Sequence, residues 1–280
     1  MSRRKRVRRT AAKVQDSHVL HGFARAGFAV NGVLHVILGS ITLAVAFGEK
    51  AIANHDGALE QLSSGPIGGL LLWAAVVGLF GLAFFQILTL ALIRGTDKKA
   101  WLARAKPFGR ALPYTGLGLL ALRFAFMGTS KGSEAQDISK ALMSHPGGVL
   151  IVAAIGLGIF IGGIVFVVMG IRGRFLDDLD TERTVVTRSA RVIGAIGYIS
   201  KGVAFMAIGV LFMIAAYQSD PEEAAGLDGA LETLRRLPSG NVALTAIALG
   251  FILFGLYCFI RSKYERLEAP AAAKRWYQRA

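Results

Sequence analysis

The stretch IGGLLLWAAVVGLFGLAFFQILTLALI, residues 67–93, decides the fold because it carries no charged side chain over 27 residues. A helix needs about 20 apolar residues to cross the ~30 Å hydrocarbon core of a bilayer. Comparable runs lie at residues 27–47, 109–128, 147–170, 193–217 and 241–260. Helices satisfy their own backbone hydrogen bonds in lipid, and the alternating segments of a membrane barrel are missing from this sequence. The sequence therefore predicts an all-α, polytopic membrane protein with six transmembrane helices.

The composition fits this class and argues against others. Of the 280 residues, 54% are hydrophobic and only 18% are charged, which does not suit one or two soluble domains. The single cysteine, Cys258, excludes an intramolecular disulfide. A net charge of +14 would suggest nucleic-acid binding in a soluble chain. Here the basic residues lie mostly between the apolar runs, so we expect no nucleic-acid partner.

The positions of Lys and Arg predict the topology. The N-terminus through Arg25, the 94–110 and 171–192 loops and the tail from Arg261 hold 25 of the 32 basic residues, and ten of the 18 acidic residues fall in the alternate loops. Basic loops resist translocation. We therefore expect a membrane protein with both termini in the cytoplasm.

The basic sequence Arg3–Arg9 precedes the first apolar run. A secretory signal peptide is an alternative interpretation, but the apolar run exceeds the usual 7–15 residues of a signal core. We expect this tail to fix the topology and to bind the anionic headgroups of membrane lipids. Binding of nucleic acid by the tail alone is a remote alternative.

The chain repeats itself three times, and internal repeats decide architecture. The sequence DGALEQL at residues 56–62 recurs as DGALETL at 228–234, and glycines 27, 32 and 39 recur at 197, 202 and 209. The middle copy is weaker. Each copy has two spans, so all three share one orientation and form parallel two-helix repeats. We expect a basic cytoplasmic tail at 1–22, repeats at 23–94, 95–180 and 181–267, and a second cytoplasmic tail at 268–280.

Small residues and short helices are the expected packing devices of the repeats. Glycines 32 and 39, 202 and 209, 78 and 81, and 158 and 162 would let neighbouring helices approach closely, with a conduit or hinge as the alternative. Asp56 and Asp228 are candidate N-caps of short interfacial helices in the outer loops. Ala58, Leu59 and Leu62 would form the apolar stripe of the first. We expect these helices to close the helix pairs; ligand binding is the alternative.

Further motifs accompany the repeated glycines and the Asp-Gly-Ala-Leu element: Pro146-Gly147-Gly148 before the fourth span and the segment RFLDDLD at residues 174–180. Together, over roughly residues 20–267, they resemble domain-of-unknown-function family 1206, which comprises bacterial, largely actinobacterial, membrane proteins. The resemblance implies the three-repeat architecture but no reaction. The family often has a basic residue before the span glycine, as in Lys201-Gly202, whereas Asn31 and Leu117 stand at the equivalent positions. Three equivalent cations are therefore not expected.

Polar residues within the spans are the candidate functional sites. Lys201 either reaches back to the cytoplasmic headgroups or meets an anion or carboxylate within the bundle. Asn31 and His35 are four residues apart and share a helix face, close to Thr42. We expect hydrogen bonds between helices there, with a polar cavity as the alternative. Arg123, near the outer end of the third span, is expected to be an interfacial anchor.

The cytoplasmic connection after the fourth span carries charges of both signs. Arg174, Asp177, Asp178 and Asp180 form a locally paired, solvated loop or a docking site for a membrane-protein partner. His18 and His21 come nearest to metal-ligand spacing, and motifs for phosphate binding or a catalytic nucleophile are lacking in the sequence. We therefore expect neither catalytic residues nor a metal or cofactor.

The sequence leaves two main functions open. The first is a non-enzymatic accessory or organising protein of the envelope, favoured by short loops and few ionisable groups in the spans. The alternative is a pseudo-threefold transporter or channel for a small molecule or ion, suggested by the three parallel helix pairs alone. An intramembrane enzyme acting on lipid is the weakest hypothesis, because two titratable groups are not placed to act as acid and base.

Overall fold

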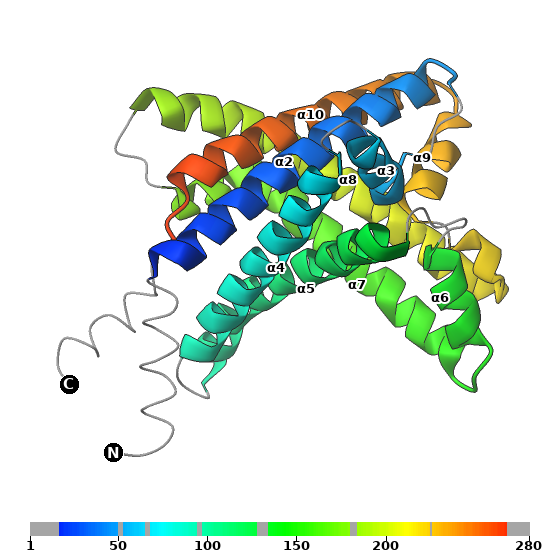
Figure 1. Cartoon of the computed structure of the whole chain (residues 1–280). Coiled ribbons are helices and arrows are strands. Elements are labelled where there is room, and N and C mark those ends of the chain that lie inside the picture. Colours follow the sequence, from blue (N-terminus) through cyan, green and yellow to red (C-terminus); the bar gives the residue numbers. More distant parts are fainter. Residues whose placement is uncertain are drawn as a thin grey trace. The chain divides into compact units, whose positions relative to one another are not determined.

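The computed structural model describes residues 17–49, 53–64, 68–93, 97–127, 134–179, 184–224 and 226–267, and this part of the chain is all helical (Figure 1). The long helices are α2 (His18–Ala46), α4 (Gly68–Leu92), α5 (Lys98–Met127), α7 (Gly148–Arg172), α8 (Thr184–Gln218) and α10 (Gly240–Tyr264). The short ones are α3 (His55–Ser63), α6 (Glu134–Met143), η1 (Arg174–Asp178), η2 (Pro221–Glu223) and α9 (Leu227–Arg235). The basic tail at residues 3–9, the tail at 268–280 and Asp180 lie outside the described residues.

Within the described residues, five helices are long and apolar enough to cross a membrane: α2, α4, α7, residues 188–218 of α8, and α10. They coincide with five of the six predicted spans and support a membrane protein. The predicted span at 109–128 lies in α5, which is less apolar than the other five helices. The charged Arg110 and Arg123 and the residue Pro113 lower its mean hydropathy.

Three long helices begin well before the apolar runs that predicted them. The helices α2, α5 and α8 start at residues 18, 98 and 184, whereas the runs start at 27, 109 and 193. Each added segment carries at least one basic residue, which lowers its hydropathy, and each contains Ala and Arg, which favour helix. Hydropathy reports only the part of a helix that suits lipid, so it underestimates helix length.

The predicted short helices are present as α3 and α9, and Ala58, Leu59 and Leu62 are buried as expected. The predicted N-caps are wrong. Asn54 caps α3, because its side-chain oxygen accepts a hydrogen bond from the Gly57 N–H at 3.0 Å. The cap position of α9 is Gly226. Both helices begin one residue before the aspartate, so Asp56 and Asp228 lie in the first turn, where a carboxylate still favours the helix N-terminus.

The chain divides into two compact units. The first contains residues 1–31, 65–128 and 258–280. In it α4 packs against α5, and α2 meets α4 through glycines. A Cβ added to Gly78 would lie 2.8 Å from the Cα of Gly27, and one added to Gly81 would lie 2.8 Å from the Cβ of Phe23. This confirms the expected close approach of helices at Gly78 and Gly81.

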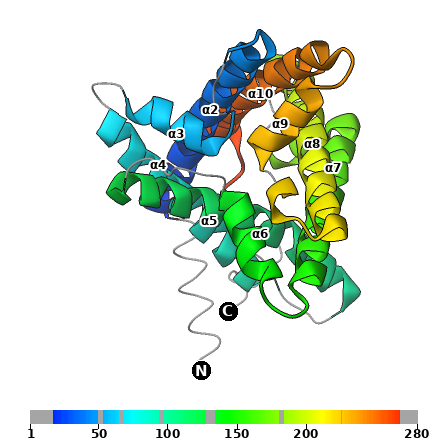
Figure 2. The ribbon, with the colours of Figure 1, turned by 90° about the vertical axis from the view of Figure 1, so that its right-hand side faces the viewer.

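The second unit contains residues 32–64 and 129–257, and two helix pairs within it meet through glycines. The helices α7 and α8 lie side by side in both views (Figures 1 and 2). A Cβ on Gly163 would lie 2.7 Å from the Gly202 carbonyl oxygen, and one on Gly156 would lie 2.9 Å from that of Gly209. The prediction for Gly202 and Gly209 is confirmed.

The same glycine spacing joins α2 to α10 in this unit. A Cβ on Gly39 would lie 2.7 Å from the Ala248 carbonyl oxygen, and one on Gly255 would lie 2.6 Å from that of Gly32. The first helix of the first repeat, α2, therefore packs against α10 through glycines. The first helix of the third repeat, α8, packs against α7 in the same way. This confirms the packing role of Gly39, and the two helices also approach closely at Gly32.

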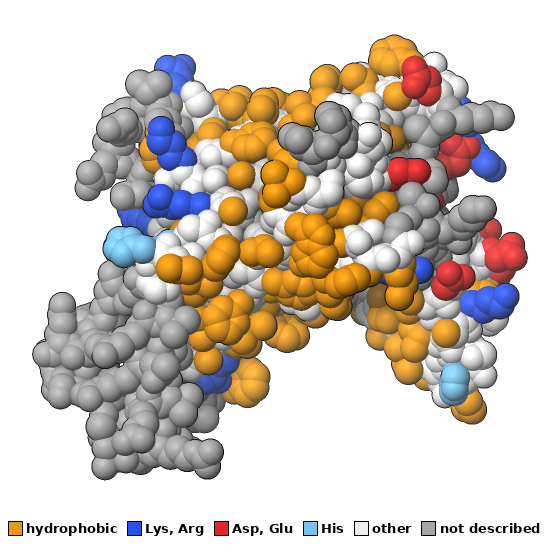
Figure 3. Space-filling view, viewed as in Figure 1, with side chains coloured by type: hydrophobic (Ala, Val, Ile, Leu, Met, Phe, Trp, Pro, Cys, Tyr) orange, Lys and Arg blue, Asp and Glu red, His pale blue; other side chains and the backbone are white. Residues whose placement is uncertain are grey.

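The prediction for Gly158 and Gly162 is wrong. A Cβ added at either position would have no neighbour within 4 Å, whereas Gly156, Gly163 and Gly170 of the same helix face α8. These three recur every seven residues and share a face, while residues 158 and 162 point elsewhere. Only 17% of the most apolar window of α7 is buried, which suits contact with lipid. Hydrophobic side chains cover much of the surface visible in Figure 3.

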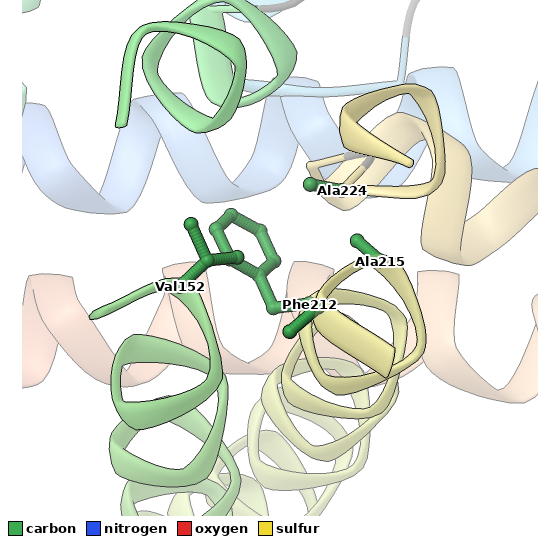
Figure 4. Packing of buried hydrophobic residues seen from close by; sticks show 5 residues of the cluster. Val152, Phe212, Ala215 and Ala224 are labelled. Carbon is green, nitrogen blue, oxygen red and sulfur yellow. The ribbon is translucent and has the colours of Figure 1, made fainter. Parts of the chain in front are cut away.

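A small hydrophobic core closes one end of the second unit (Figure 4). It joins Val152 of α7 to Phe212 and Ala215 of α8 and to Ala224 after η2. Residues of α6 pack against this core, and the Gln136 side-chain amide donates a 2.7 Å hydrogen bond to the Glu222 carbonyl oxygen. The short elements thus cover the ends of long helices, as predicted for the outer loops.

Candidate functional site

Two candidate residues from different helices meet inside the second unit. Lys201 of α8 places its Nζ 3.0 Å from Nε2 of His35 on α2. His35 is buried, with 1% of its surface exposed, and Lys201 is part-buried. A protonated lysine can only donate hydrogen bonds, so in that state Nε2 of His35 accepts and the imidazole is neutral. We call Lys201 and His35 the Lys–His pair.

Aromatic rings surround the ammonium group of the pair. The Lys201 Nζ lies 4.4 Å from the ring centroid of Phe254, 5.7 Å from that of Phe166 and 5.9 Å from that of Phe205. The negative faces of such rings attract a cation, and more strongly where water is excluded. The rings therefore offset part of the cost of placing a charge within the helix bundle.

A second histidine packs against the pair. The His55 ring of α3 lies 6.0 Å from that of His35, edge to face. The pKa of His55 is lowered from 6.5 to about 4. Burial is the larger cause, and the nearby charge of Lys201 is the smaller one. Its Nε2 is buried and has no hydrogen-bond partner among the residues that the structure describes. A proton on His55 would thus be both desolvated and next to a cation.

The depressed pKa of His55 predicts that acid destabilises the fold. The unfolded chain binds a proton near pH 6.5 and the folded chain only near pH 4, so the unfolding free energy should fall as pH drops through this window. The full effect of this shift is about 3 kcal/mol. Thermal unfolding in detergent from pH 7.5 to 4 should show a drop in Tm that the substitution His55→Gln flattens. His145→Gln, at an exposed position, is the control; an unchanged slope in His55→Gln would refute the assignment.

Asn31 has a separate partner in the first unit. Its side-chain amide donates to Sγ of Cys258 on α10 at 3.3 Å, and both residues are buried. The expected bonds between helices are therefore found at Asn31 and His35. Thr42 instead donates to the Leu38 carbonyl oxygen of its own helix, at 2.7 Å. Arg123 lies exposed about one turn before the end of α5.

Sequence reasoning missed a buried ion pair at the end of α10. Arg261 and Glu265 are 3% and 8% exposed, and the guanidinium Nε donates to the carboxylate at 2.7 Å, with a second bond from Nη2. Arg110 of α5 lies 3.9 Å from the same carboxylate, and the Arg261 guanidinium lies 4.2 Å from the Phe28 ring centroid. The charge count places Arg261 at the start of the C-terminal tail, and its i,i+4 spacing to Glu265 is the signal in the sequence for the ion pair.

The candidate docking residues lie on the turn η1. Phe175 and Leu176 are buried, the Phe175 ring stacks on Tyr198 at 5.0 Å, and the Tyr257 hydroxyl donates to the Phe175 carbonyl oxygen at 3.2 Å. Arg174 and Asp177 are exposed, while Asp178 is part-buried. A rigidly anchored turn therefore displays charges of both signs. No three His, Cys, Asp or Glu side chains within the described ranges are grouped closely enough to hold a metal ion.

Comparison with known proteins gives a family and one relative. The model of the family described as "Domain of Unknown Function (DUF1206)" matches residues 26–89, 105–173 and 196–265. A Bacillus subtilis (strain 168) protein described as "Uncharacterized protein YxxB" is 30% identical over 253 residues, covering 88% of this chain and 91% of that protein. No solved structure matches.

Proposed function

Because the chain belongs to the DUF1206 family, whose model matches it three times, we propose a protein of the bacterial cytoplasmic membrane with six spans in three parallel two-helix repeats. Each matched segment contains a long, a short and a second long helix: α2, α3 and α4, then α5, α6 and α7, then α8, α9 and α10. This shared order supports the repeat boundaries 23–94, 95–180 and 181–267. The lopsided Lys and Arg distribution supports cytoplasmic termini.

The sixth span in this proposal is the C-terminal part of α5. The helix has 30 residues and is about 45 Å long, so it exceeds the thickness of the hydrocarbon core. Arg123 lies close enough to its end for the guanidinium to reach the headgroups. The position of this helix in the second repeat matches those of α2 and α8 in the others.

The proposed role is that of a non-enzymatic accessory or organising protein. The observation that carries it is the use of intramembrane polar groups to join helices: Lys201 to His35, and Asn31 to Cys258. Asn31 and Lys201 occupy the same position in the first and third repeats. Asn31 contacts α10, the second helix of the third repeat, and Lys201 contacts α2, the first helix of the first repeat. Polar side chains used in this way hold helices together. These contacts between helices favour a scaffold role over a substrate-binding role.

Purification of the tagged chain from its native membrane in mild detergent tests this role. We expect one membrane protein to copurify at a fixed ratio. Replacing the exposed charges of η1, by Arg174→Gln with Asp177→Asn, should lower its recovery by about tenfold. Glu60→Gln, at an exposed position on α3, should not. Recovery of the wild-type chain alone, stabilised by a small-molecule substrate, would contradict the proposal.

The alternative function is transport of a proton or small ion, and the Lys–His pair favours it. Ionisable groups within a bundle often mark ion pathways. In proteoliposomes with an internal pH-sensitive dye, a transporter should give proton flux that Lys201→Met lowers at least about tenfold and that Lys263→Met, at an exposed position, leaves unchanged. Flux equal to that of protein-free liposomes would exclude proton transport.

A further inference from the structure

The polar start of α5 combines exposed aromatic residues with positive charge. Between residues 98 and 110 the sequence has five Lys or Arg and no Asp or Glu. The large side chains Trp101, Phe108 and Leu112 are 65%, 54% and 58% exposed. They recur at helical spacing on one face, while Ala100 and Ala111 are buried on another. We call residues 98–112 the α5 entry segment.

Two of the cations flank this apolar stripe on the helix surface. At 100° per residue, Lys98 and Arg104 lie about 60° to either side of the stripe, whereas Lys106 and Arg110 lie about 140° and about 180° away from it. The Arg104 guanidinium lies 5.3 Å from the Trp101 ring centroid and donates to the Ile93 carbonyl oxygen at 3.1 Å. These contacts hold its charged group beside the exposed indole.

Helix length places the entry segment at the edge of the membrane. A core of ~30 Å takes up about 20 of the 30 residues of α5. The far end of the helix is apolar, with Phe126 and Met127 70% and 80% exposed, so the polar start is the end that extends out of the core. Trp residues favour this headgroup level, and basic groups there attract anionic lipids.

We propose that the α5 entry segment binds an anionic phospholipid. The phosphate-bearing headgroup meets Lys98 and Arg104, and an acyl chain lies along Trp101, Phe108 and Leu112. Charge complementarity selects this occupant: the segment is purely basic, and its exposed stripe is purely apolar. A neutral lipid satisfies only the stripe. This site is separate from the basic tail at residues 3–9.

Trp101 is a built-in reporter for this lipid. The full chain carrying Trp73→Phe and Trp276→Phe is placed in nanodiscs with a minority of phosphatidylglycerol in phosphatidylcholine. Bromine, which quenches indole fluorescence, is attached to one lipid or the other, so the composition stays constant. We expect bromine on phosphatidylglycerol to quench at least about fivefold more per mole than bromine on phosphatidylcholine. Equal quenching by the two brominated lipids would overturn the proposal. This test needs no charge variant.

Charge variants and competitors sharpen the test. Lys98→Gln with Arg104→Gln should abolish the preference. Arg235→Gln with Arg236→Gln, which removes two cations from α9, should keep it. A preference that survives in the first variant would overturn the proposal. Inorganic phosphate, compared with chloride at equal ionic strength, should not remove the preference; if it does, the site takes the phosphate group alone and the lipid proposal fails. Thermal unfolding checks that each variant is folded.

Discussion

Replacing Gly156 and Gly163 of α7 together by leucine should abolish stable folding, whereas the same change at Gly158 and Gly162 should leave the protein folded. At the first two positions a Cβ would lie within 3 Å of backbone atoms of α8, which cannot rotate away as a side chain can. At the other two it would have no neighbour within 4 Å. Overpacking costs about 1–3 kcal/mol per site and more where backbone must move. Two sites therefore remove several kcal/mol from a fold stabilised by about 5–15 kcal/mol.

The two double variants are a matched pair, because they add the same atoms to the same helix. Size-exclusion chromatography in detergent and thermal unfolding should give a monodisperse, stable control and an aggregated or strongly destabilised test variant. Leucine also favours helix over glycine in both, so helix propensity cannot explain a difference. Equal stability of the two variants would show that α7 does not meet α8 through Gly156 and Gly163.

The substitution Glu265→Gln should destabilise the protein by about 3–5 kcal/mol. The carboxylate accepts two hydrogen bonds from the buried Arg261 and lies 3.9 Å from Arg110. Its removal leaves a buried guanidinium without its countercharge, and the desolvation cost of that charge remains. Replacing Arg261 and Glu265 together by methionine removes both charges and should recover most of the loss.

Glu232→Gln is the control for this experiment. Glu232 also pairs with two arginines, and the hydrogen bond from Arg235 lowers the pKa of Glu232 to about 2, with a further bond from Arg236. This group is exposed on α9, so water screens the attraction and little stability depends on it. Thermal unfolding should therefore separate the two glutamates. A Glu265→Gln protein as stable as Glu232→Gln would contradict the burial of the α10 ion pair.

The long helices were predictable because each depends on a local property. A run such as residues 67–93 is apolar over enough consecutive positions to identify itself, and the helix α4 follows it closely. The start of α5 was not predictable in this way. Its first eleven residues include four Lys or Arg and a proline, so hydropathy treats them as a loop although they are helical. Helix ends depend on propensity and capping, which leave weak signals in sequence.

The candidate site was predictable in its members but not in its contacts. Lys201 and His35 stand out as ionisable residues within apolar runs, but they are 166 residues apart and occupy different positions in their repeats. Their meeting depends on how α8 and α2 are rotated about their axes. The same rotation decides that Gly163, and not Gly162, faces α8. A shift of one residue places a side chain on a different face of the helix. The sequence alone does not show which face meets the neighbouring helix.

The glycine contacts between α2 and α10 affect how the chain is made. The first long helix packs against the last, with Gly32 and Gly39 meeting residues 248–255. At 5–20 residues per second, the ribosome needs about 10–40 s to reach α10 after finishing α2. During that time α2 sits in the bilayer before its final neighbour exists, with Asn31 and His35 already inserted. The first helix must therefore remain in the membrane without its final packing partner until translation is nearly complete.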